Sequence, residues 1–196
     1  QDSFGFTLVN NDNKITLINK KGLLTNSNLS NLDGYMGIGH VRYPTNGSKD
    51  IKNCQPFLIH GEKTTISFVH NGQINKSMKL LNYIIDSGIK IEDLNNVSDS
   101  YILGKIFVYL LDQRKVKLTN YFIYKCLERL YDIIDGAYNC IMLIKDYGLV
   151  CFKDPHGIRP LIFASKDNNY MIASESVCAE NLDYNVVGDI INGECL

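Results

Sequence analysis

Two helix-like segments divide the chain into two groups of strand-like segments, and this order limits the folds that it can adopt. Apolar residues recur at helical spacing after Ser98-Asp99-Ser100 and again over Asn120–Ile133. The alternating segments Phe4–Asn10 and Lys14–Asn19 come first and are joined by a turn-forming Asn-Asp-Asn. A nearly continuous apolar strand, Ala137–Ile144, follows the helices. The pattern predicts an α+β fold with two packed sheets and helices outside.

Shorter segments extend this pattern on both sides of the two helices. No linker-like stretch separates two domains, so residues 1–196 are interpreted as one domain. Ser98 or Ser100 is expected to cap the first of the two long helices. Further strands are expected at Met36–Arg42, from Leu58-Ile59, and at Thr65–Asn71, Gly148–Phe152, Leu161–Ala164 and Tyr170–Ala173, with a further helix at Gln73–Ser87.

The composition is that of a globular domain and argues against several classes of protein. The chain has 196 residues, 45% of them hydrophobic, and a net charge of -1, so it can bury a core and shows no basic patch. Nucleic acid is therefore not an expected partner. The apolar runs are too short to span a membrane. The six cysteines form no Cys-x-x-Cys pair, which argues against a structural zinc site and favours a reducing, cytoplasmic location.

The segment Met36–Ser48, MGIGHVRYPTNGS, reads as a strand that runs directly into a loop. The period of a strand places His40 and Arg42 on one face. Pro44 disfavours a helix at this point, so a rigid strand holds Arg42 at the mouth of a polar loop. A guanidinium group binds a carboxylate with two hydrogen bonds, and the hydroxyl of Thr45 can add another. A surface arginine at a strand end is the simpler alternative.

A second informative stretch is Val69-His70-Asn71-Gly72, where a strand is expected to end before a helix. The side-chain amide of Asn71 and the backbone N–H of Gly72 can point to one position just past the strand. Two such donors form an oxyanion hole, which stabilises negative charge on a carbonyl oxygen. Because Asn-Gly is a common turn dipeptide, a simple turn is the alternative.

Asp99 lies at the predicted start of a helix, where an acid is favoured by the helix dipole alone. The functional alternative is a carboxylate that binds a substrate ammonium group. Together, Arg42, Asp99 and the Asn71-Gly72 pair offer a cation for a carboxylate, an anion for an ammonium group and donors for a carbonyl. These three requirements describe an α-amino acid with a side-chain amide, which is glutamine or asparagine.

Seven motifs in order carry a resemblance to a known family. They resemble the glutaminase domain of the glutamine phosphoribosylpyrophosphate amidotransferases over essentially the whole chain, from Gln1 to Leu196. These proteins are class II glutamine amidotransferases with the N-terminal-nucleophile hydrolase fold, so the resemblance implies a four-layer αββα sandwich. The motifs are GIGHVRYPTNGS, NCQPF, FVHNGQI, SDS, GAYNCIML, DPHGIRPL and ASES.

The resemblance implies a role for each of the singled-out residues. Arg42, helped by Thr45, would hold the α-carboxylate of L-glutamine, and Asp99 would hold its α-amino group. Asn71 and Gly72 would form the oxyanion hole. The motif DPHGIRPL is interpreted as a structural turn between strands.

The implied activity is that of an enzyme, a transferase of de novo purine synthesis. Glutamine is hydrolysed to glutamate and ammonia, and the ammonia then reacts with phosphoribosyl pyrophosphate to give phosphoribosylamine. The phosphoribosyltransferase domain that performs the second step is expected as a partner but has no counterpart in residues 1–196, which lack a Gly-rich phosphate loop. No cofactor is expected in the glutaminase domain, since magnesium belongs with the transferase domain. The parent enzyme is expected to be a homo-oligomer.

The N-terminus departs from the family pattern. Gln1-Asp2-Ser3 resembles the second half of a His-Arg-Gly-Gln-Asp/Glu-Ser motif, so the chain is expected to lack the first strand, the first helix and the N-terminal nucleophilic cysteine. Such a chain should be inactive in glutamine hydrolysis. Cys54 is the nearest other cysteine, but it has no α-amino group to act as a base, and we interpret it as a small core residue.

Two alternatives remain open at this stage. The chain can be a non-catalytic, degenerate glutaminase fold that binds glutamine or a protein. It can also belong to another class II amidotransferase, although the glucosamine-6-phosphate synthase group usually has Arg-Trp-Ala-Thr where this chain has Arg-Tyr-Pro-Thr at 42–45.

Overall fold

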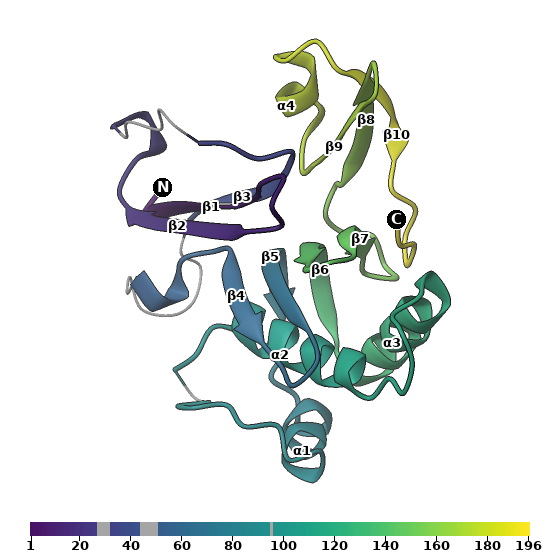
Figure 1. Ribbon diagram of the computed structural model, residues 1–196. Helices are drawn as coiled ribbons and strands as arrows, with labels where there is room; N and C mark the ends of the chain where they lie inside the picture. Colours follow the sequence, from purple (N-terminus) through teal and green to yellow (C-terminus); the bar gives the residue numbers. More distant parts are fainter. Residues whose placement is uncertain (27–31, 44–50, 95) are drawn as a thin grey trace.

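The computed structural model describes residues 1–26, 32–43, 51–94 and 96–196, and the described part contains three antiparallel sheets (Figure 1). The first has the strand order β2-β1-β3. β1 (Ser3–Val9) and β2 (Ile15–Lys21) form the predicted hairpin, and β3 (Met36–Arg42) pairs with the other edge of β1. The prediction of this hairpin and of the strand ending at Arg42 is confirmed.

The second sheet has the order β4-β5-β6-β7 and forms the centre of the molecule (Figure 1). β4 (Phe57–His60) is a short strand beside the longer β5 (Thr65–Ile74). β6 (Gly136–Ile144) pairs with β5 along its whole length, and β7 (Gly148–Lys153) completes the sheet. β4 begins at Phe57, which pairs with Phe68. The part of β5 after Phe68 therefore has a strand on one side only.

Three helices cover one face of the central sheet (Figure 1). They are α1 (Met78–Asp86), α2 (Asp99–Asp112) and α3 (Asn120–Ile133). The main core lies between these helices and the sheet, and its side chains are fully or almost fully buried. Ser98 caps α2 by accepting a hydrogen bond from the N–H of Tyr101, as the sequence indicated. Short 3₁₀ turns occur at Leu24–Asn26 and Ile51–Asn53.

The other face of the central sheet packs against the first sheet. Apolar side chains fill this interface, with Val9 and Ile38 from one sheet and Val69 and Leu143 from the other. The arrangement confirms the α+β class and gives three layers in the described residues, which are helices, sheet and sheet. The fourth layer of the expected sandwich stays a prediction.

A third sheet, with the order β10-β8-β9, follows the central one (Figure 1). β8 (Ile162–Lys166) and β9 (Asn169–Ala173) agree with the two strands predicted there. The helix α4 (Ser176–Glu180) and the strand β10 (Asn185–Asp189) were not predicted. No helix in the described ranges is long and apolar enough to cross a membrane.

The start of α1 corrects one expectation. The predicted helix Gln73–Ser87 begins only at Met78, because β5 continues through Ile74, which pairs with Gly136 of β6. Ser77 then caps the helix by accepting a hydrogen bond from the N–H of Leu80. Ile74 lies at a position that fits the helical spacing of the apolar residues after it, but it belongs to β5.

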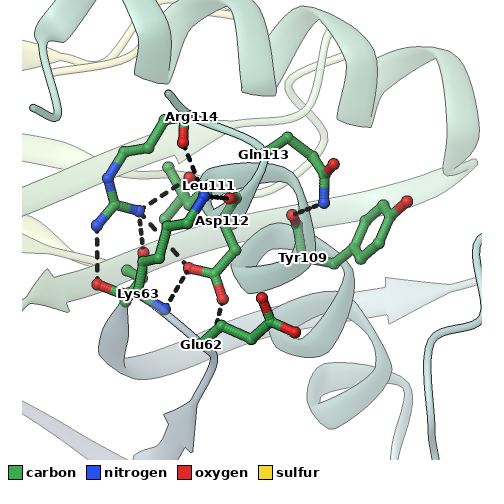
Figure 2. Close-up of polar contacts among 8 residues, drawn as sticks. Glu62, Lys63, Tyr109, Leu111, Asp112, Gln113 and Arg114 are labelled. Carbon is green, nitrogen blue, oxygen red and sulfur yellow. Dashed lines mark hydrogen bonds and ion pairs between the residues drawn. The ribbon is translucent and has the colours of Figure 1, made fainter. Parts of the chain in front are cut away.

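The C-terminus of α2 is tied to the β4–β5 hairpin by a polar cluster (Figure 2). The buried carboxylate of Asp112 accepts hydrogen bonds from the N–H groups of Glu62 and Lys63 at 2.5 and 3.2 Å. The ammonium group of Lys63 donates to the carbonyls of Asp112 and Arg114, both at 2.9 Å. These contacts satisfy carbonyl groups that the helix end leaves without partners and fix the direction of α2.

Candidate functional site

A cavity of about 620 Å³ brings together most of the residues that the sequence singled out. Arg42, Asn71, Gly72 and Asp99 all line it, although they come from β3, β5 and α2. Thr45 lies outside the described residues. The four described residues thus line one cavity, and their roles in binding stay predictions.

Arg42 is the last residue of β3 and is only 7% exposed. Its main chain is held in the sheet, since its carbonyl accepts a hydrogen bond of 2.9 Å from the N–H of Asp2. A buried arginine is uncommon because desolvation of a guanidinium group is costly without compensating interactions. The strand thus holds a cation at the wall of the cavity.

Asp99 is the first residue of α2 and faces the end of β5. Its Oδ1 accepts a hydrogen bond from the N–H of Ser100, and its Oδ2 accepts one from the N–H of Ile74, each at 2.9 Å. The carboxylate therefore interacts favourably with the N-terminus of the helix and joins the helix to the strand. Both the cavity and the joint between α2 and β5 depend on this side chain.

Asn71 and Gly72 lie inside β5, which corrects the expectation that the strand ends there. They pair with Asn139 and Tyr138 of β6. The predicted turn would have freed their donors just past the strand, whereas the structure places them on a strand that continues to Ile74.

The donor direction of Gly72 follows from its neighbours on the strand. The N–H of His70 donates to the Gln55 side chain at 2.7 Å, and the N–H of Ile74 donates to Asp99 at 2.9 Å. Both N–H groups point away from β6. Because N–H groups in an antiparallel ladder alternate in direction, the N–H of Gly72 points to the same open edge.

Only glycine fits at position 72. Its φ of +152° lies in a region that L side chains rarely adopt. A Cβ atom built there would lie 2.0 Å from the carbonyl oxygen of Ala137 and 2.7 Å from the Cα of Tyr138. Glycine therefore allows β6 to approach closely at the position where the donor faces the cavity.

The side-chain amide of Asn71 has one partner in the described part of the chain. Its Nδ2 donates to the hydroxyl of Ser174 at 3.4 Å. Ser174 belongs to the ASES motif and directly follows β9. The hydrogen bond therefore joins the Asn71 side chain of the central sheet to the end of the third sheet. Because an amide nitrogen carries two hydrogens, Asn71 keeps a second one for another acceptor.

Two neutral histidines lie beside these groups. Burial, with smaller contributions from His70 and Arg42, lowers the pKa of His40 to about 4. Burial also lowers the pKa of His70 to about 4, although Asp99 acts in the opposite direction. The Nδ1 of His70 is hydrogen-bonded to the hydroxyl of Ser100 at 2.8 Å, and both side chains are buried.

The sequence missed part of the cavity wall. Arg159 lines the cavity, although its motif, DPHGIRPL, was interpreted as purely structural. That interpretation holds for Asp154, whose carboxylate accepts hydrogen bonds from the N–H groups of Tyr138, His156 and Gly157. The sequence showed the motif, but its single arginine was not assigned to the site.

The cysteines differ in exposure and in their distance from the cavity. Cys54 is 2% exposed and is enclosed by other atoms, as expected for a core residue. Cys178, in α4, is exposed and lines the cavity, as do Ser174 and Glu175 before it. In the described ranges no cluster of three or more metal-ligating side chains occurs.

Comparison with known proteins identifies the family. The glutamine amidotransferase domain family matches residues 42–181. The chain is 34% identical over 206 residues to the amidophosphoribosyltransferase of Escherichia coli, an alignment that covers 100% of this chain and 40% of that protein. It is 34% identical over 182 residues to the amidophosphoribosyltransferase of Saccharomyces cerevisiae, covering 90% of this chain and 35% of that one. The chain thus spans about 40% of the length of these relatives.

A solved structure shows the same fold. The glutamine phosphoribosylpyrophosphate amidotransferase of B. subtilis superimposes with a TM-score of 0.79 and 24% identity, over 100% of this chain and 40% of that one. The likeness confirms the N-terminal-nucleophile hydrolase type of fold. The family match begins at Arg42 and includes the segment that carries Asn71, Gly72 and Asp99. By sequence and by architecture, the chain belongs to the glutamine amidotransferase domain family.

Proposed function

We propose that the cavity binds L-glutamine and that the protein is the glutaminase part of an amidophosphoribosyltransferase. The observation that carries this proposal is the presence of Arg42, Asp99, Asn71 and Gly72 on the wall of one cavity. The curated relatives are named amidophosphoribosyltransferases, which supports the choice of reaction.

Each charged group has a proposed ligand partner. Arg42 holds the α-carboxylate with two hydrogen bonds, and Thr45 adds a hydroxyl. Asp99 holds the α-ammonium group while its carboxylate also binds the main chain of Ile74. Opposite charges at the two ends of the amino-acid backbone discriminate glutamine from simple amides.

The donors of Asn71 and Gly72 act on the side-chain carbonyl. When a nucleophile attacks this carbon, the oxygen becomes negative and both donors bind it more strongly than they bind the carbonyl. Removal of one such donor typically costs about 100- to 1000-fold in rate. The neutral histidines beside the site add no positive charge to it at pH 7.

The product ammonia would then react with phosphoribosyl pyrophosphate on a phosphoribosyltransferase domain, giving phosphoribosylamine for purine synthesis. We propose this domain, and further copies of the protein, as partners. We place the reaction in the cytoplasm, in keeping with six cysteines that are all free thiols.

Isothermal titration calorimetry with L-glutamine tests the proposal. The unchanged protein should bind one glutamine per chain. Arg42→Ala and Asp99→Ala should each weaken binding by about 10- to 100-fold, the usual effect of removing a charged hydrogen-bond partner. Arg129→Ala and Asp132→Ala, which change exposed residues of α3, serve as matched controls and should bind glutamine normally. Equal affinity in all five proteins would refute the assignment.

A further inference from the structure

A chain of buried polar groups lies beside the proposed oxyanion donors, at the wall of the same cavity. Gln55, His70 and Ser100 are 6%, 3% and 4% exposed. The pairing of β4 with β5 does not extend past Phe57 and Phe68, and the side chain of Gln55, just before β4, takes the place of a strand by accepting the N–H of His70 at 2.7 Å. The same side chain donates from its Nε2 to the hydroxyl oxygen of Ser100 at 3.1 Å.

The direction of each hydrogen bond follows from the first one. A backbone N–H can only donate, so the Gln55 atom that accepts it is the oxygen, and the other amide atom is the nitrogen. The Ser100 oxygen accepts from that nitrogen and directs its own hydrogen elsewhere. Its short contact, 2.8 Å, is to the Nδ1 of His70, whereas Asp99 Oδ1 is 3.5 Å away. We therefore assign the Ser100 hydrogen to the shorter of these two contacts, the one to His70 Nδ1.

His70 consequently has one tautomer. A ring nitrogen that accepts a hydrogen bond carries no hydrogen, so in the neutral ring the hydrogen lies on Nε2, a buried atom that has no hydrogen-bond partner among the described residues. Burial keeps the pKa of His70 at about 4, so the ring is neutral at pH 7.

Two backbone N–H groups on either side of Gly72 are thus held by side chains. Gln55 holds the N–H of His70, and Asp99 holds the N–H of Ile74. Ser100 connects the two, because its hydroxyl contacts Gln55 and its N–H donates to Asp99 at 2.9 Å. The N–H of Gly72 lies between them and is left to face the cavity.

We propose that Gln55, Ser100 and His70 are positioning residues that fix the N–H of Gly72 in the direction of a ligand carbonyl, through a hydrogen-bond chain that runs from Gln55 to Ser100 to the Nδ1 of His70. The role in ligand binding rests on the proposed function, whereas the direction of the chain does not. The three residues act by holding the edge of β5 that β4 leaves open in strand geometry, on the side opposite β6.

Nitrogen-15 NMR of histidine-labelled protein tests the direction at pH 7.5. The His70 signals, identified by their loss in His70→Asn, should show a bare Nδ1 and a protonated Nε2. In Gln55→Glu the carboxylate accepts from both His70 N–H and Ser100, so Nδ1 should gain a hydrogen. A protonated Nδ1 in the unchanged protein, or a bare Nδ1 in a folded Gln55→Glu, would overturn the proposed direction.

A pair of ligands tests the positioning role. L-norvaline has the same carbon skeleton as glutamine but no carboxamide, so the ratio of the two affinities reports on contacts to the amide. Ser100→Ala should reduce this ratio by about 10-fold, chiefly through weaker glutamine binding, because one well-placed donor contributes about this much. Ser100→Thr keeps the hydroxyl and should restore the ratio.

Ser67→Ala is the matched control. Ser67 is also buried in β5, and its hydroxyl is hydrogen-bonded to that of Thr7 at 2.6 Å, away from the cavity. Ser67→Ala loses one buried hydrogen bond and Ser100→Ala loses two, so both should lower the melting temperature, but only Ser100→Ala should change the affinity ratio. An unchanged ratio in Ser100→Ala, or the same change in Ser67→Ala, would refute positioning. Failure of the unchanged protein to bind glutamine refutes the proposed function instead, and the NMR result still decides the direction.

Discussion

The Oδ2 atom of Asp99 accepts a hydrogen bond of 2.9 Å from the backbone N–H of Ile74, so one carboxylate both lines the cavity and joins α2 to β5. Asp99→Asn separates the two roles. The amide oxygen of asparagine can still accept from Ile74, but the negative charge and the acceptor for the N–H of Ser100 are lost. We expect glutamine affinity to fall about 10-fold or more, while the melting temperature falls less than in Asp99→Ala. Asp99→Ala should lower both, and calorimetry with thermal unfolding distinguishes the two variants.

Gly72→Ala should destabilise the protein strongly. The added Cβ would lie 2.0 Å from the Ala137 carbonyl oxygen, and this atom belongs to the main chain of β6 and cannot move aside on its own. We expect a loss of about 3 kcal/mol in unfolding free energy, measured by urea denaturation. Gly188→Ala is the control, because nothing lies within 4 Å of a Cβ there. A loss at position 72 no larger than at position 188 would contradict the close approach of the two strands.

The cluster at the end of α2 should contribute to stability without affecting ligand specificity. Asp112→Ala removes the acceptor for the N–H groups of Glu62 and Lys63 and the ion pair to Arg114 at 3.6 Å (Figure 2). We expect a loss of about 2 to 4 kcal/mol, since the abandoned donors are partly buried. The glutamine-to-norvaline affinity ratio should stay the same. The exposed Asp132→Ala, measured in the same urea titration, should lose less than about 0.5 kcal/mol.

Acid should destabilise the fold through its buried histidines. The unfolded chain protonates a histidine near pH 6.5, but the folded chain protonates His40 and His70 only near pH 4. The unfolded state therefore binds more protons between these values, and stability is lost as the pH falls from about 6.5 towards 4. For His70 the loss is on the order of 3 kcal/mol. His70→Asn should flatten the pH dependence of urea unfolding over this range.

Thiol labelling should distinguish the cysteines. Cys178 is exposed and lines the cavity, whereas Cys54 is buried. Burial also raises the pKa of Cys126 and Cys195 to about 12, which leaves little reactive thiolate. Iodoacetamide followed by mass spectrometry should modify Cys178 first, and saturating glutamine should slow that reaction. Faster modification of Cys54 would contradict the enclosed position that the structure gives it.

Local signals in the sequence were enough to predict much of the fold. The hairpin of β1 and β2 has a turn sequence between two alternating segments, and α2 has a serine cap before a periodic run. The start of α1 was wrong because Ile74 fits a helical spacing, although it pairs with Gly136 in a sheet. β10 is exposed throughout and α4 is only five residues long, so neither has a buried face that leaves a pattern.

The site was partly predictable for a different reason. Arg42, Asn71, Gly72 and Asp99 each sit in a short motif, and the order of the motifs carried the family resemblance. Contacts between distant segments leave no such mark. The hydrogen bond from Asn71 to Ser174 joins residues 103 positions apart, and nothing in either motif indicates the other. The hydrogen bond from the N–H of His70 to the Gln55 side chain could not be predicted either, because the sequence does not show how far β4 pairs along β5.

The wall of the cavity is built from all three sheets, with Arg42 from the first, Asn71 from the second and Ser174 after β9 of the third. A bound amino acid would therefore act as a non-covalent cross-link between parts of the chain that fold from separate hairpins. Occupancy at 100 times the dissociation constant adds about 2.7 kcal/mol to the unfolding free energy. Cells that are rich in the ligand would accordingly hold this protein in a more proteolysis-resistant form than starved cells do.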